Sequence, residues 1–154
     1  MESKQQSYRA SIILSLITLS LFFSTYTAYC AENTGPRRII SLDGRWEIAE
    51  GGMDSVPRSF EHKVPVPGLV DMAKPAFDEV GKKSEKRQAF WYRRTFTVEG
   101  RIPAVAILKI HKAKYGTKVF LNGKLAGEHL PCFTPALLDV KKFLKGSGKQ
   151  NELT

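Results

Sequence analysis

Apolar and polar residues alternate through much of the second half of the chain, with the period of two that is typical of β-strands. From Trp91 to Val98, one face of the predicted strand carries Tyr92, Phe96 and Val98. Two further series continue the alternation. They are Ala104, Ala106, Leu108 and Ile110, and then Tyr115, Thr117, Val119 and Leu121. We therefore expect a run of short strands, each with one apolar face.

A tight turn interrupts this pattern at Asn122-Gly123. The segment Val119 to Leu121 leads into the turn, and Lys124 to Ala126 leads out of it. Both central residues of a two-residue hairpin turn need positive φ, which Asn and Gly adopt readily. The sequence therefore predicts four closely spaced strands between residues 90 and 129, the last two joined as a hairpin.

The segments before residue 90 are less regular. Arg45 to Ala49 predicts the first strand, with Trp46 and Ile48 on one face. The segment from Lys63 to Gly68 is extended, but its two prolines cannot donate ladder hydrogen bonds, so it belongs at a sheet edge. A long polar connection follows, residues 69–89.

Helical signals are short. Val70 to Ala73 and Val140 to Leu144 are each compatible with a single turn, and Asn151 to Thr154 reads like the entry to another strand. Period-two alternation with Gly and Pro punctuation, and without an amphipathic helix, predicts an antiparallel β-sandwich.

The N-terminus has the organisation of a secretory signal peptide. Lys4 and Arg9 precede an uncharged stretch, residues 10–31, and small residues flank Tyr29 before the end of the leader at Cys30. Its apolar heart is shorter than the ~20 residues that cross a bilayer. We predict a helical signal peptide over residues 1–30, a flexible lead-in over residues 31–40, and a secreted or periplasmic protein with no membrane span after cleavage. An uncleaved leader or a lipidated Cys30 is the alternative.

The charge balance is basic, with 24 Lys and Arg against 15 Asp and Glu and a formal net charge of +9. This balance raises polyanion binding as a hypothesis. However, the basic residues are scattered over several predicted loops and strands, without a Lys/Arg-rich helix or an RNA-binding aromatic motif. We expect them to be solvated, and we predict no nucleic-acid partner.

Residues for metal or nucleophilic chemistry are sparse. Cys132 would be the single cysteine of the mature chain, which excludes an internal disulfide and a CxxC zinc cluster, and we expect it to be buried. His62, His111 and His129 are too widely spaced for a metal site. Serine and cysteine hydrolase signatures are absent. We predict no metal, no cofactor and no catalytic residue in this chain.

The order of several motifs resembles a known family. SLDGRW at residues 41–46 resembles an opening L-x-G-x-W, and WYRRTF, YGT-x-VFLNGK, AGEH, FTP and DV follow in order, with the likeness running to Leu153. Together they closely resemble the N-terminal sugar-binding domain of family 2 glycoside hydrolases, which include β-galactosidases, β-glucuronidases and β-mannosidases. The resemblance implies a galactose-binding-like jelly-roll sandwich over residues 41–154.

The resemblance also implies a function. Glycoside hydrolysis normally needs two facing carboxylates, and in this family both catalytic glutamates lie in a separate barrel domain. We therefore expect a non-catalytic sugar-binding domain of a secreted enzyme that hydrolyses O-glycosidic bonds in carbohydrate metabolism. Its partners would be a β-linked glycoside and the catalytic barrel of the parent enzyme. A free-standing secreted carbohydrate-binding module is the alternative, and a basic polyanion-binding domain is another.

Five residues are candidate sugar contacts. Trp91 could stack on a sugar and Arg93 could donate to its hydroxyls, although an aromatic strand with outward arginines is also ordinary sandwich architecture. In the resembling family, the connection after V-P-G can reach the mouth of the active site. This makes Asp71, Lys74 and Asp78 candidate polar contacts, with a solvated loop as the competing interpretation.

The resemblance finally implies an incomplete domain. In the family, the N-x-L segment at residues 151–153 leads directly into a strand that pairs inside the sandwich. Loss of that strand would leave a neighbour with unpaired backbone groups, and an exposed edge of this kind promotes association.

Overall fold

The computed structural model describes residues 37–82 and 87–154. Residues 41–154 form one compact unit, and the fold described below belongs to it. The predicted signal peptide and the first part of the predicted lead-in lie outside the described residues.

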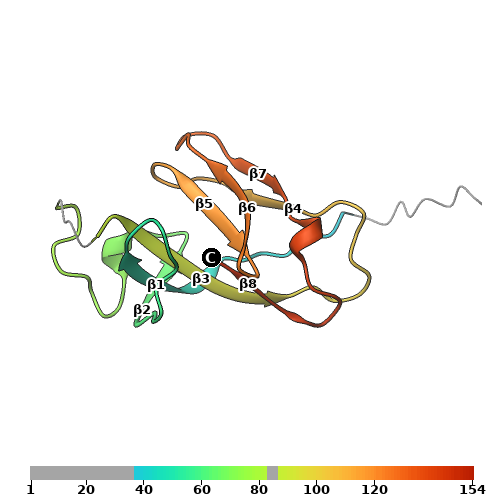
Figure 1. Ribbon diagram of the computed structural model, residues 1–154, viewed down its shortest axis with the longest axis horizontal. Coiled ribbons are helices and arrows are strands. Elements are labelled where there is room, and N and C mark those ends of the chain that lie inside the picture. The colour runs from blue at the N-terminus through green and yellow to red at the C-terminus, as the bar shows by residue number, and fades with distance from the viewer. Residues whose placement is uncertain (1–36, 83–86) are drawn as a thin grey trace, which may run out of the picture. The chain divides into compact units, whose positions relative to one another are not determined.

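Within the described residues, eight strands form two antiparallel sheets (Figure 1). The larger sheet has the strand order β2-β1-β3-β8-β5-β6, and the smaller sheet consists of β4 and β7. The strand bounds are β1 Gly44–Gly51, β2 His62–Val66, β3 Ala89–Thr97, β4 Ile107–Ile110, β5 Thr117–Leu121, β6 Lys124–His129, β7 Ala136–Asp139 and β8 Gln150–Leu153. Two short 3-10 turns, η1 (Val70–Met72) and η2 (Lys141–Phe143), stand where single turns were expected. The predicted antiparallel β-sandwich is confirmed.

Two apolar clusters hold this unit together. The first combines Ile48 and Val64 of β1 and β2 with Ala73 and Phe77 of the connection after η1. The second joins the two sheets. Its members include Val119, Leu121 and Leu153 of the larger sheet and Leu108, Ile110 and Leu138 of the smaller one. Trp46 packs against both clusters.

The hairpin at Asn122-Gly123 is also confirmed. Asn122 has a φ of 54° and Gly123 a φ of 76°, the positive values that the turn needs. The register of β5 and β6 shifts between Val119 and Phe120, so a β-bulge increases the local twist of this pair.

The last residues of the chain form β8, which agrees with the strand entry predicted at Asn151. β8 pairs with β3 from Arg94 to Thr97 and with β5 at Leu121. Thr154 and Phe120 exchange both backbone hydrogen bonds, at 2.7 and 2.9 Å. β3 is therefore paired with β8 from Arg94 to Thr97, and β5 is paired with the end of the chain at Phe120 and Leu121.

Three side chains differ from the predicted pattern. Tyr115 has a φ of 65° and is 71% exposed, because the chain turns in this loop before β5 begins. Ala104 is exposed and precedes β4. Cys132 is half-buried in the β6–β7 loop rather than buried. Periodicity does not detect where a loop ends and a strand starts, which explains Tyr115 and Ala104, whereas Cys132 was expected to be buried only because of its residue type.

The first part of the long connection, residues 69–78, is better packed than a solvated loop. Lys63 of the edge strand β2 exchanges two backbone hydrogen bonds with Lys74, at 2.8 and 2.9 Å. Ala73 is fully buried and Phe77 is 8% exposed. The Phe77 ring stacks on His62, with 3.9 Å between centroids. The predicted edge position of β2 is confirmed, and the connection covers part of that edge.

Candidate functional site

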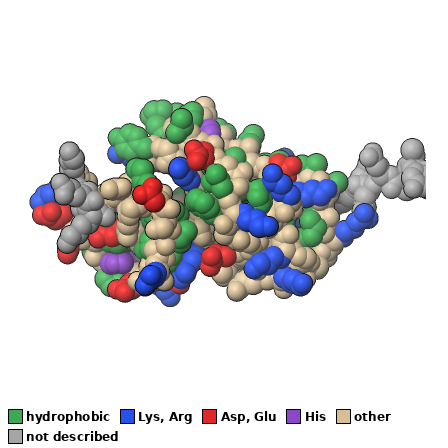
Figure 2. Space-filling model, viewed as in Figure 1, with side chains coloured by type: hydrophobic (Ala, Val, Ile, Leu, Met, Phe, Trp, Pro, Cys, Tyr) green, Lys and Arg blue, Asp and Glu red, His purple; other side chains and the backbone are tan. Residues whose placement is uncertain are grey.

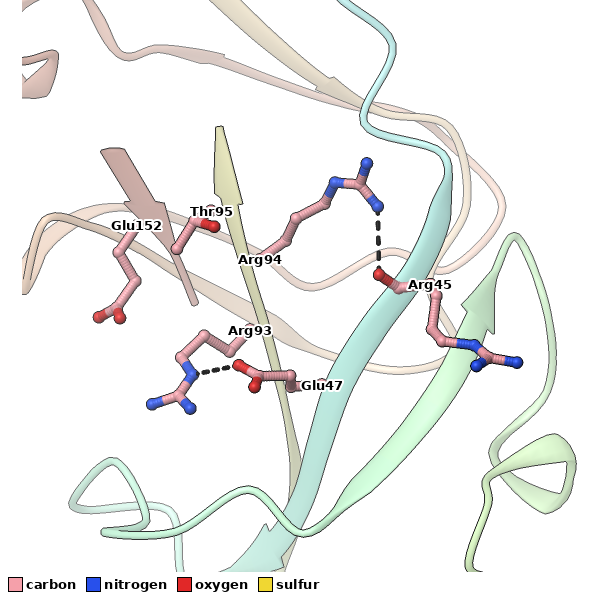
Figure 3. A pocket seen from close by; sticks show the side chains of 6 residues that line it. All are labelled: Arg45, Glu47, Arg93, Arg94, Thr95 and Glu152. Carbon is pink, nitrogen blue, oxygen red and sulfur yellow. Dashed lines mark hydrogen bonds and ion pairs between the residues drawn. The ribbon is translucent and has the colours of Figure 1, made fainter. Parts of the chain in front are cut away.

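An open depression of about 600 Å³ lies on one face of the larger sheet. Its lining residues come from β1, β3 and β8, the strands at the middle of the sheet (Figure 3). They are Arg45, Glu47, Arg93, Arg94, Thr95 and Glu152. Antiparallel register explains the grouping, because Glu47 stands opposite Arg93 and Thr95 stands opposite Glu152.

Arg93 is the polar group of this depression that two contacts restrain. Its Nε donates a 2.7 Å hydrogen bond to Glu47 Oε2, and its guanidinium carbon lies 4.1 Å from the centroid of the Phe60 ring. Both contacts restrain the side chain. The terminal nitrogens of Arg93 make no hydrogen bond to another residue in the described part of the chain, so they remain available as donors to a ligand.

The other arginines do not converge on the same point. Arg94 Nη1 donates to the Arg45 carbonyl at 3.2 Å. Figure 3 shows the Arg45 guanidinium pointing away from the pair formed by Arg93 and Glu47. Thr95 and Glu152 lie on the Arg93 side of the view. The usable polar surface is therefore the part around Arg93.

Trp91 lies two residues before Arg93 on β3, but its side chain is buried rather than open to the depression. The side chain is 7% exposed, its Nε1 donates a 2.8 Å hydrogen bond to the Gly52 carbonyl, and its ring centroid lies 5.9 Å from that of Phe120. A buried ring with a satisfied indole N–H offers no face to a sugar. The structure therefore corrects the hypothesis of a Trp91 platform in favour of the structural interpretation.

The three candidates of the long connection lie elsewhere. Asp71 is in the first turn of η1, and Lys74 and Asp78 are exposed beyond it. None of them lines the depression around Arg93. The Arg87 guanidinium donates hydrogen bonds to the carbonyls of Asp78 and Glu79. These bonds link the end of the connection to its middle. The candidate residues predicted from the sequence therefore lie at two separate places, Arg93 at the depression and Asp71, Lys74 and Asp78 on the connection after β2.

Sequence reasoning missed the partners of Arg93. Glu47 and Glu152 are far from it in sequence and become neighbours only through strand pairing. Phe60 lies in a loop without a periodic pattern. A correct register for β1 against β3 would have revealed Glu47, but alternation alone does not specify register between distant strands.

The depression offers hydrogen-bond donors and acceptors on an open surface. Glu47 and Glu152 are the carboxylates that line it. Glu47 is paired with Arg93 at 2.7 Å. Donors and acceptors in an open polar surface are suited to hydroxyl groups.

Two further observations concern the described part of the chain. No group of three or more His, Cys, Asp or Glu residues within it could hold a metal ion. No helix in the same residues has the length and apolar character to cross a membrane.

Comparisons with known proteins place this fold. No protein-family model and no curated protein sequence matches the chain, but solved structures do. A β-glucuronidase from Bifidobacterium dentium, complexed with coumarin-3-O-glucuronide, matches at 30% identity with a TM-score of 0.59 over 78% of this chain. A β-glucuronidase from Ruminococcus gnavus, in complexes with uronic deoxynojirimycin and with D-glucuronic acid, matches at 22% identity with a TM-score of 0.54 over 74% of this chain. The chain spans 20% of the length of each of these structures.

Proposed function

We propose that the chain acts as a carbohydrate-binding part of a secreted β-glycosidase, since residues 41–154 form a domain like the N-terminal domain of family 2 glycoside hydrolases. The observation that carries the proposal is the match to a β-glucuronidase at 30% identity over 78% of the chain, in which the chain spans 20% of that enzyme. Hydrolysis of the O-glycosidic bond would belong to a barrel domain that supplies both carboxylates.

The geometry of the depression supports a non-catalytic role. Glu47 Oε2 accepts a 2.7 Å hydrogen bond from Arg93 Nε, so this carboxylate already has a partner within the domain. The terminal nitrogens of Arg93 and the hydroxyl of Thr95 offer hydrogen bonds without proton transfer. This polar surface supports recognition of sugar hydroxyls.

The connection after β2 supports a second contribution, to the wall of a substrate pocket. Its inner side is anchored by Ala73 and Phe77 in the first apolar cluster. Its outer side presents Asp71, Lys74 and Asp78, which are exposed. A firmly packed segment with a polar outer side can hold these groups towards a β-linked glycoside at low entropic cost.

The proposal is tested by assaying the purified chain against chromogenic β-galactosides, β-glucuronides and β-mannosides. We expect no turnover above buffer, because the two-carboxylate machinery is not supplied by these residues. Turnover that disappears in Glu47→Gln or Glu152→Gln would contradict the non-catalytic role.

A second experiment separates the domain of an enzyme from the free-standing module. The native reading frame is sequenced beyond Thr154, and we expect it to continue into a barrel domain with paired glutamates. A stop codon at that point would favour the free-standing carbohydrate-binding module.

Export through the N-terminal leader completes the proposal. N-terminal sequencing of protein recovered outside the cytoplasm should give Ala31 as the first residue. Recovery of the intact leader in a membrane fraction would favour the anchored alternative.

A further inference from the structure

Two loops lie side by side at one edge of the domain. They are the β4–β5 loop, residues 111–116, and the β6–β7 loop, residues 130–135. A Cβ atom on Gly116 would lie 3.4 Å from Leu130 Cδ2, and Lys112 Nζ lies 5.3 Å from the centroid of the Phe133 ring. We call these two loops the aromatic tip. In Figure 2, hydrophobic side chains gather at the upper edge, where Figure 1 places the loops beside β5 and β7.

The aromatic tip exposes large apolar side chains. Tyr115 is 71%, Leu130 76% and Phe133 84% exposed. Scattered exposed apolar residues need no explanation, but several on two adjoining loops form a patch of the kind that marks a binding surface. Tyr115 is in addition held at a φ of 65°, a backbone conformation that is unfavourable for an aromatic residue and that is not used to bury its ring.

The aromatic tip is also positively charged. Lys112 lies over Phe133, and Lys114 Nζ lies 5.4 Å from the centroid of the Tyr115 ring. Neither lysine forms an ion pair with another residue in the described ranges. The two loops contain no Asp or Glu, and the flanking Glu128 already pairs with Lys118 at 3.5 Å.

We propose that the aromatic tip binds an acidic carbohydrate, a glycan that carries uronate groups. The C–H face of a pyranose ring packs on an exposed aromatic ring, and its carboxylate then reaches the ammonium group that stands over the same ring. A neutral sugar leaves both lysines without a partner. A second copy of the chain would bring lysine against lysine, which is unfavourable.

This surface is separate from the depression around Arg93. None of the residues that line the depression belongs to the aromatic tip. The proposal therefore goes beyond the function proposed above. If the chain did hydrolyse a chromogenic glycoside, the function proposed above would fail, but the aromatic tip could still bind an acidic glycan, because this binding requires no catalytic barrel.

Calorimetric titration of the purified chain tests the ligand class with three probes. They are an oligoglucuronate, the carboxyl-reduced neutral oligosaccharide of the same length, and an oligoglutamate of the same charge. We expect the oligoglucuronate to bind, with the other two at least about tenfold weaker. Undetectable binding of the oligoglucuronate, or equal binding of the neutral sugar, would overturn the proposal. Equal binding of oligoglutamate would overturn it too, in favour of an acidic protein partner.

Four variants locate the site. Phe133→Ala should weaken oligoglucuronate binding about tenfold, and Lys112→Gln at least about threefold. Tyr115→Gly removes the second ring and suits the positive φ, so it should lose affinity without losing thermal stability. Lys142→Gln is the matched control, because Lys142 Nζ also lies over a ring, 4.9 Å from the Phe143 centroid, but on η2. A loss of affinity in Lys142→Gln as large as that in Lys112→Gln would overturn the assignment.

Discussion

Asn122 shows how much a single residue contributes to this fold. Its backbone takes the positive φ of the hairpin turn, and its side chain connects three segments. Asn122 Nδ2 donates to the Phe143 carbonyl at 2.8 Å and to Asn151 Oδ1 at 2.9 Å, and its Oδ1 accepts from the Glu152 N–H at 3.0 Å. The turn signal in the sequence thus marks a residue that also fixes β8.

Gly123→Val should destabilise the protein by about 1–3 kcal/mol, the usual cost of strained backbone. No atom lies within 4 Å of a Cβ at Gly123, so the cost comes from its φ of 76° rather than from a clash. Chemical denaturation of the variant measures the loss. Gly146→Val is the matched control, since its Cβ also meets open space and its φ is not positive. Equal stability of the two variants would remove the turn strain from this account.

Asn151→Ala should cost at least about 2 kcal/mol of unfolding free energy. Asn151 is fully buried, and its Oδ1 accepts hydrogen bonds from Asn122 Nδ2 and from the Lys145 N–H at 2.8 Å. Without this acceptor, the two donors lose their shared partner. Urea denaturation measures the change, and the exposed neighbour Glu152→Ala should stay within about 0.5 kcal/mol of the parent. A similar effect of both substitutions would argue against the buried polar pair.

At the scale of elements, β3 contributes side chains to both faces of the larger sheet. Tyr92 packs against the first apolar cluster and Phe96 against the second. On the other face, Trp91 is covered while Arg93 lines the depression. Alternation predicted the first pair correctly. The burial of Trp91 depends on Gly52, Phe120 and other segments that approach from distant parts of the chain.

Tyr92 provides a pH-dependent test of this packing. Burial raises the pKa of the Tyr92 phenol above its ordinary value. The stability linked to this group is therefore fully present below the unfolded pKa of about 10 and is lost as pH rises through the folded value. The melting temperature should fall less steeply above about pH 10 in Tyr92→Phe than in the parent.

The control for this experiment is Tyr115→Phe. Tyr115 is 71% exposed, so its removal should leave the alkaline fall in melting temperature unchanged. If Tyr115→Phe flattened the curve as much as Tyr92→Phe, burial of Tyr92 would not be the cause.

At the scale of the whole domain, the two sheets differ in how many of their strands have a neighbour on both sides. β8 closes the middle of the larger sheet, whereas β4 pairs with β7 alone among the strands of the described residues. Two-stranded sheets are marginal by themselves, and here the second apolar cluster holds the pair against the larger sheet. The outer face of β4 and β7 exposes Ile107 and Leu137, at 52% and 62%. Open edges with apolar neighbours favour association.

Ile107→Lys should therefore reduce self-association of the chain, because a charge on an edge strand opposes further strand pairing. Sedimentation velocity across a concentration series measures the effect. Ser147→Lys adds the same charge in an exposed loop and should change little. An equal effect of the two substitutions would point to net charge rather than to the edge of β4.

Fold class, most strands, the hairpin and the two single turns could be predicted from the sequence alone. These features depend on local physics: alternation of side chains along a strand, the positive φ of Asn122 and Gly123, and the missing N–H groups of prolines. Motif order further indicated the likeness to family 2 glycoside hydrolases, which the structural match to β-glucuronidases supports.

Which side chains meet could not be predicted in this way, because it depends on long-range packing. Strand register placed Glu47 beside Arg93, packing buried Trp91, and the return of the long connection buried Ala73 and Phe77. The loops that carry Tyr115 and Phe133 adjoin through the same long-range pairing. The physical reason is that local patterns specify which face of a strand is apolar, whereas contacts between distant strands depend on how all the faces are buried together.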